Sequence, residues 1–132
     1  GWTITAIDNK ADALERCQQL AETSNVELTT VLIDLEKQPQ LLTNHNADLV
    51  LVMRYLHRPL FSAIDSMIKS GGAIVYSTFM LGSEQFGSPR NPNYLLKPGE
   101  LAEQFSSYKI IIDEQRKLLD GRPVCLFVAI KL

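Results

Sequence analysis

Short β-rich runs alternate with helical segments along this chain, and that alternation limits the folds open to it. The runs cover residues 2 to 8, 27 to 34, 48 to 53 and 73 to 78. Segments whose apolar residues recur at helical spacing separate most of them. Strands that alternate with helices favour a mostly parallel sheet with helices on both faces. We therefore expect an α/β fold with three layers.

Local signals predict where the helices begin and end. One helix is expected over residues 10 to 22, with Cys17 on its core face. A second begins at Pro59 and continues to Ser70, because the Gly71-Gly72 pair stops it. The run at 48 to 53 is continuously apolar, which suits a strand covered on both faces.

The last part of the chain predicts antiparallel pairing. A short helix opens near Pro98 and Glu100, and β-rich runs follow at 108 to 114 and 124 to 131. The Asp120-Gly121 pair between these runs is a turn signal. An antiparallel hairpin should therefore close the sheet.

Size and charge exclude several classes of protein. The chain has 132 residues, of which 45% are hydrophobic and 21% are charged, so we expect a single domain over residues 1–132. Its 13 basic and 15 acidic residues give a formal charge of -2, which offers no general attraction to nucleic acid. No apolar run is long enough for a membrane span. Two cysteines and two histidines are too scattered for a zinc site, so no metal is expected, and a reducing cytoplasm is the simplest location.

Polar residues follow the carboxyl ends of the predicted parallel strands, where ligands bind in sheets of this kind. They are Asp8-Asn9, Asp34-Leu35, the stretch 53 to 58, and residues 77 to 80. A binding site is expected among them.

Four stretches carry a resemblance to a known family. They read ITAIDNKADALERC at 4 to 17, ADLVLVMRYLHRPL at 47 to 60, GGAIVYSTF at 71 to 79 and FGSPRNPNYLLKPGEL at 86 to 101. The chain resembles class I, Rossmann-like S-adenosylmethionine-dependent methyltransferases, and in particular small bacterial enzymes related to tellurite-resistance methyltransferases. The terminal hairpin matches that family too. The resemblance implies S-adenosylmethionine as cofactor and a small molecule as methyl acceptor.

The resemblance also implies cofactor-binding residues. Asp8 would accept hydrogen bonds from both ribose hydroxyls, and Asn9 would line the adenosine pocket. Asp34 would meet the exocyclic amine of adenine, and the backbone amide of Leu35 a ring nitrogen. Met53 and Arg54 would complete the cofactor site. The alternative is that Asp8 only caps a helix and Asp34 only stabilises a turn.

The stretch after the apolar strand supplies the candidate catalytic residues. Tyr55 would orient the donor methyl group, and His57 would act as a general base, because histidine is the side chain that most often moves protons near neutral pH. Arg54 or Arg58 could hold an anionic substrate. A structural histidine and an ion pair between Arg58 and a carboxylate are the alternatives.

The loop from Phe86 to Lys97 is long for a structureless connection, which is typical of functional loops. We expect a lid with Arg90 and Tyr94 as its inward, substrate-binding groups. A proline-stiffened connection without ligand contact is the alternative. Cys17 and Cys125 are expected to be packing residues.

One feature of the family is missing from these residues. The family begins with a strand and a Gly-rich loop, and no G-x-G-x-G occurs here. We expect an N-terminally incomplete domain, a sheet that closes differently, or a strand supplied by another copy. An incomplete sheet would also favour a homo-oligomer through an exposed edge.

The sequence pattern is also compatible with other functions. A non-catalytic remnant that binds partners is the main alternative, and a phosphoacceptor receiver domain and a nicotinamide-dependent oxidoreductase are weaker ones. A nucleic-acid adenine methyltransferase is disfavoured because Arg54-Tyr55-Leu56-His57 is not the D/N-P-P-aromatic tetrad of that group.

Overall fold

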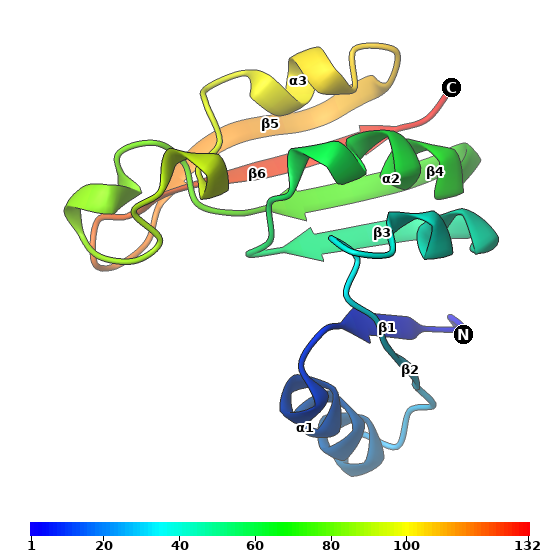
Figure 1. The fold of residues 1–132 in the computed structure, drawn as a ribbon. Helices are drawn as coiled ribbons and strands as arrows, with labels where there is room; N and C mark the ends of the chain where they lie inside the picture. Colours follow the sequence, from blue (N-terminus) through cyan, green and yellow to red (C-terminus); the bar gives the residue numbers. More distant parts are fainter. The chain divides into compact units, whose positions relative to one another are not determined.

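The computed structural model describes all residues, 1–132, as two compact units. Unit 1 is Gly1–Leu41 and unit 2 is Leu42–Leu132. Each is described by itself below (Figure 1). The single domain over 1–132 stays a prediction.

Unit 1 consists of a helix and a two-stranded parallel sheet. Its elements are β1 (Thr5–Asp8), α1 (Ala11–Thr23) and β2 (Thr29–Leu32). The register pairs Thr5 with Thr29 and Asp8 with Leu32. Both strands therefore end at the same edge of this sheet, as the parallel arrangement predicted.

The buried face of α1 is narrower than its apolar pattern suggested. Leu14 and Ala21 are buried, whereas Cys17 is exposed and Leu20 is 68% exposed. The expectation that Cys17 lies on the core face is wrong. Leu14, Cys17 and Ala21 follow one another at i+3 and i+4 spacing, so the helical period alone puts them on one face. Their burial differs because neighbouring segments cover Leu14 and Ala21 and leave Cys17 open.

Unit 2 contains a four-stranded mixed sheet in the order β3-β4-β6-β5. Its elements are β3 (Ala47–Met53), α2 (Phe61–Met67), β4 (Ile68–Ser77), α3 (Glu100–Gln104), β5 (Lys109–Lys117) and β6 (Pro123–Ile130). β3 and β4 are parallel, and β6 is antiparallel to both β4 and β5. The predicted terminal hairpin is confirmed.

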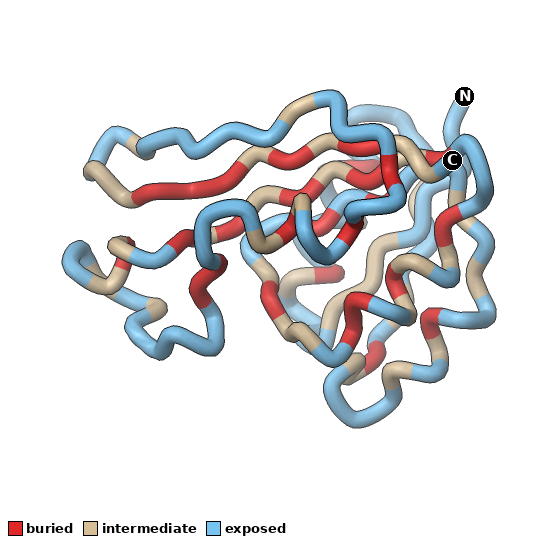
Figure 2. The backbone as a smooth tube through the Cα atoms, turned by 90° about the horizontal axis from the view of Figure 1, so that it is seen from above, coloured by how far each residue is buried: buried red, intermediate tan, exposed pale blue.

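An aromatic cluster forms the core between the helices and this sheet. Both α2 and α3 lie on one face of the sheet (Figure 1). The ring of Phe105 lies 6.0 Å from that of Phe61, 5.2 Å from that of Tyr108 and 6.1 Å from that of Phe127. Such ring pairs stabilise a core beyond the area they bury. Buried and half-buried residues alternate along β4 from Gly72 and along β6 from Cys125. Figure 2 colours the backbone by the burial of each residue.

Helix α2 is shorter, and strand β4 longer, than the sequence suggested. The helix ends at Met67, and β4 begins at Ile68 and continues through Gly71 and Gly72. A Cβ atom at Gly72 would lie 3.0 Å from the carbonyl oxygen of Asp48, so this glycine permits close strand approach. The glycine pair therefore serves the strand and does not stop the helix.

Strand β3 is covered on one face within unit 2. Val50 and Val52 are buried, whereas Leu51 is 59% and Met53 51% exposed. The expectation of two covered faces is not met within this unit, because both of its helices lie on the same side. None of the helices is both long and apolar enough to cross a membrane.

Candidate functional site

In unit 1, two half-buried carboxylates stand at neighbouring strand ends. Asp8 ends β1, and Asp34 follows β2 by two residues. The backbone amide of Ile33 donates to the Asp8 carbonyl oxygen at 3.0 Å, which continues the ladder to this edge. The sheet thus brings the two predicted cofactor-binding acids to one edge.

Each of these carboxylates also stabilises a local turn. Asp8 Oδ1 accepts from the Lys10 amide at 3.0 Å, and Asp34 Oδ1 accepts from the Glu36 amide at 3.1 Å. A carboxylate has about four lone-pair sites, so these bonds leave acceptor capacity for a ligand. Asn9 beside the first acid is exposed, and Leu35 beside the second is half-buried.

In unit 2, the ends of β3 and β4 meet at one edge because the strands are parallel. Met53 pairs with Ser77, and the amide of Arg54 donates to the Ser77 carbonyl oxygen at 2.8 Å. Arg54 has a φ of 54°, a left-handed conformation that is costly for a non-glycine residue. Strained residues of this kind cluster at functional sites.

Two arginines contact the ring of Phe79 at this edge. The guanidinium carbon of Arg54 lies 5.0 Å from the ring centroid, and that of Arg122 lies 5.5 Å from it. Arg54 Nη1 also donates to Ser77 Oγ at 3.3 Å. The ring therefore gathers two positive charges through cation–π attraction.

Sequence reasoning missed Arg122 and included Phe79 only as part of the strand-end stretch 77 to 80. The only signal for Arg122 was its place directly after the Asp120-Gly121 turn, because β6 begins there beside the end of β4. The amide of Met80 donates to the Pro123 carbonyl oxygen at 3.0 Å, which holds the two segments together. Arg122 Nε also pairs with Asp120 Oδ2 at 2.9 Å.

The candidate catalytic residues Tyr55 and His57 are both half-buried. The hydroxyl of Tyr76 donates to the Tyr55 carbonyl oxygen at 2.7 Å, and the Leu60 amide donates to the His57 carbonyl oxygen at 2.9 Å. Burial raises the pKa of Tyr76, so this hydroxyl keeps its proton. The backbone that carries both candidate side chains is therefore held in place.

Arg58 binds protein groups in the structure. Its guanidinium pairs with Glu100 at 2.6 Å and donates to the backbone carbonyl oxygens of Asn93 and Leu95. The hydrogen bonds to Glu100 raise the pKa of Arg58. Burial opposes ionisation of Glu100, but the bonds from Arg58 and the Lys97 amide outweigh it and hold the pKa of Glu100 below its ordinary value.

Arg90 and Tyr94, the predicted inward groups of the lid, are exposed. Tyr94 belongs to a short 3-10 turn, Pro92–Tyr94, which is capped by the side chain of Asn91. Phe86, at the start of this loop, contacts Gly121, because a Cβ atom there would lie 2.8 Å from its ring.

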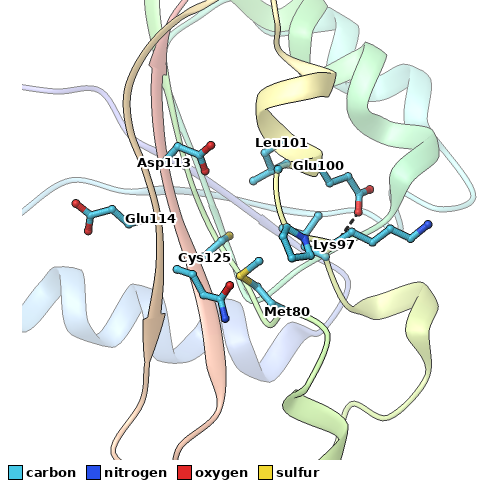
Figure 3. Close-up of a pocket in the computed structure, with 11 residues that line it drawn as sticks. Met80, Lys97, Glu100, Leu101, Asp113, Glu114 and Cys125 are labelled. Atoms are coloured by element: carbon cyan, nitrogen blue, oxygen red, sulfur yellow. Dashed lines mark hydrogen bonds between the residues drawn. The ribbon is translucent and has the colours of Figure 1, made fainter.

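A cavity of about 180 Å³ lies between the β5–β6 hairpin and the segment before α3. Figure 3 shows Leu101, Asp113, Met80 and Cys125 around it, with Glu114 pointing away. None of the predicted site residues lines this cavity. Burial raises the pKa of the Cys125 thiol, which favours a packing role.

Metal ligands do not converge in the structure. No group of three or more His, Cys, Asp or Glu side chains could hold a metal ion. Both cysteines are free thiols.

Comparison with known proteins gives one curated relative, and no family model matches the chain. The relative is the uncharacterized protein UNK4.09 of Schizosaccharomyces pombe (strain 972 / ATCC 24843), which is 30% identical over 112 residues. The match covers 81% of this chain and 33% of that protein. The chain thus spans about a third of the relative's length.

Solved structures resemble the chain over its whole length. TehB from Haemophilus influenzae has a TM-score of 0.74 at 18% identity, covering 100% of this chain and 51% of that one. Magnesium protoporphyrin IX methyltransferase (ChlM) from Synechocystis PCC 6803, with bound SAH, has a TM-score of 0.73 at 13% identity, covering 100% and 65%. An S-adenosylmethionine-dependent methyltransferase from Clostridium acetobutylicum ATCC 824 has a TM-score of 0.66 at 9% identity, covering 99% and 76%.

These structural similarities agree with the mixed parallel and antiparallel sheet and with its terminal hairpin. The chain has the Rossmann-like fold of the class I methyltransferases.

Proposed function

We propose that residues 1–132 belong to an S-adenosylmethionine-dependent methyltransferase that acts on a small acceptor. The observation that carries this proposal is the whole-chain similarity to methyltransferase structures, one of which contains bound SAH. The two carboxylates at neighbouring strand ends of unit 1 support it further, because ribose hydroxyls and an adenine amine are donors that such groups accept.

Unit 1 would hold the adenosine part of the cofactor. Asp8 would accept from the ribose hydroxyls, with Asn9 beside it. Asp34 would accept from the adenine amine, and the amide of Leu35 would donate to the ring. S-adenosylmethionine supplies an electrophilic methyl group on a positively charged sulfur.

Unit 2 would position the acceptor. In methyl transfer the carbon–sulfur bond breaks as the bond to the acceptor forms, and sulfur leaves as a neutral thioether. The leaving group needs no proton, so positioning is the main task. Tyr55 would orient the donor methyl group, and Met53 and Arg54 would be further contacts of the cofactor. His57 would remove a proton where the acceptor carries one.

The charge at the edge of unit 2 favours an anionic acceptor. Arg54 and Arg122 both contact Phe79, and Arg54 is exposed. Arg90 and Tyr94 on the neighbouring loop would add a hydrogen-bond donor and an aromatic ring to the acceptor site.

We also propose that the protein is located in the cytoplasm.

Calorimetric titration of the complete natural polypeptide with S-adenosylhomocysteine tests the cofactor assignment. We expect saturable binding, and Asp8→Ala should weaken it by about tenfold to a hundredfold, since each bond to a charged group contributes about 1.5–3 kcal/mol. Asp12→Ala is the matched control, because Asp12 is an exposed carboxylate on α1 that pairs with Arg16. It should leave the affinity unchanged.

Two outcomes would contradict the proposal. Equal affinity of Asp8→Ala and the unchanged protein would remove Asp8 from the site. A complete lack of binding would favour the non-catalytic remnant.

A further inference from the structure

The connection between β4 and α3 is held by arginine side chains that bind its backbone carbonyl groups. Arg58 Nη1 donates to the Asn93 carbonyl oxygen at 2.9 Å, and Arg58 Nη2 donates to that of Leu95 at 2.9 Å. Arg122 Nη1 donates to the Ser88 carbonyl oxygen at 3.1 Å. A loop lacks the regular partners of a helix or strand, so such donors satisfy its polar backbone.

A carboxylate fixes the Arg58 guanidinium in this position. Arg58 Nε donates to Glu100 Oε2 at 2.6 Å, and Nη2 donates to Oε1 at 3.0 Å. Glu100 Oε1 also accepts from the Lys97 amide at 3.0 Å. The Arg58 side chain is 34% exposed and that of Glu100 18%, so this two-point pair is partly shielded from water.

We infer that Arg58 is a positioning residue, which clamps residues 93 to 100 onto the segment that follows β3. The groups that Arg58 binds are backbone carbonyl groups of the protein and the Glu100 carboxylate. The inference rests on the proposed function only for the substrate-binding role of Tyr94.

The number of donors distinguishes this role from anion binding. A guanidinium has five N–H donors, and four hydrogen bonds to Glu100, Asn93 and Leu95 leave one. One remaining donor cannot bind an anionic substrate at two points. Lysine could not replace this arginine, because an ammonium group lacks the planar fork that reaches a carboxylate and two carbonyl groups together.

The clamp also argues against the expectation that this part of the loop opens and closes as a lid. Backbone hydrogen bonds from Leu81 to Leu96 and from Leu96 to Phe79 tie the same stretch to the end of β4. Opening a lid here would break these bonds together with those of Arg58. Residues 93 to 97 therefore form a fixed wall, which presents Tyr94 at a constant position.

Amide hydrogen exchange of Arg58→Lys tests the clamp directly, without any ligand. The amides of Tyr94, Leu95 and Leu96 are hydrogen-bonded and report on the loop. We expect their exchange to become about tenfold faster or more, because bonds to a charged group are lost. Amides of β6 should keep their rates, whereas a general loss of stability would accelerate them too.

Arg116→Lys is the matched control. Arg116 pairs with Glu114 on β5, and these side chains are 58% and 51% exposed, so the same change should leave the loop rates unaltered. If Arg58→Lys does not fold, Glu100→Gln replaces it with the same expected local acceleration. Unaltered loop rates in the variant that folds would overturn the inference.

Chemical rescue adds a second readout. In Arg58→Gly, millimolar ethylguanidinium should restore slow exchange of Leu95 and Leu96, and ethylammonium should not. Equal rescue by both cations would show that charge alone matters and would contradict the positioning role.

Discussion

The hydroxyl of Tyr76 donates a 2.7 Å hydrogen bond to the backbone carbonyl oxygen of Tyr55. This contact joins the carboxyl end of β4 to the segment that carries the candidate catalytic residues. Tyr76 is only 1% exposed, so its hydroxyl and the carbonyl group have little access to water.

Tyr76→Phe should therefore lower the free energy of unfolding by about 1–3 kcal/mol, because it leaves the Tyr55 carbonyl group without its partner. Urea unfolding measures the change. Tyr94→Phe is the control, since Tyr94 is 48% exposed and should lose almost nothing. Equal stability of the two variants would show that the Tyr76 hydroxyl is dispensable.

The Glu100 carboxylate should make stability depend on pH below neutrality. Its pKa is lowered from 4.5 despite burial, because the Arg58 and Lys97 bonds favour the charged form. A carboxylate whose pKa is lower in the folded protein stabilises it above the unfolded pKa and loses this effect as the pH falls through the folded pKa. Arg58 and Lys97 are the charged groups that act on it, and the Glu100 charge in turn helps to raise the pKa of Tyr76.

Glu100→Gln should accordingly cost about 1.5–3 kcal/mol at neutral pH, and this difference should shrink as the pH falls below 4.5. Urea unfolding of both proteins over a pH series measures it. A difference that stays constant across the series would contradict the ionic origin of the contact.

The left-handed backbone of Arg54 predicts an unusual response to glycine. Arg54→Gly should leave the free energy of unfolding unchanged or raise it by up to about 1 kcal/mol, because glycine adopts a positive φ without steric cost. Arg116→Gly in strand β5 should lower it by about 0.5–1 kcal/mol. Equal destabilisation by both changes would argue against strain at Arg54.

The aromatic cluster should dominate the stability of unit 2. Phe105 is 2% exposed and contacts three other rings, so Phe105→Ala should cost about 3–5 kcal/mol. Leu119→Ala, at a fully exposed position in the hairpin turn, should cost almost nothing. Thermal unfolding compares the two, and a loss under about 1 kcal/mol for Phe105→Ala would contradict this account of the core.

The sequence alone determined the order and type of most elements. β-Rich runs, helical spacing and the Asp120-Gly121 turn predict strands, helices and the terminal hairpin. Each of these signals acts over a few neighbouring residues, because backbone dihedral preferences and side-chain periodicity are local. The four stretches that resemble methyltransferases also pointed to the observed fold.

Tertiary structure decided the contacts that join distant segments. Arg58 and Glu100 are 42 residues apart in the chain, and Arg54, Phe79 and Arg122 come from three separate segments. Strand pairing and the packing of the connection after β4 bring these residues together. Contacts between segments far apart in the chain depend on the whole fold, whereas backbone propensity and side-chain periodicity report only on near neighbours. For the same reason the burial of Cys17 and the end of α2 were mispredicted, since both depend on which neighbours cover a surface.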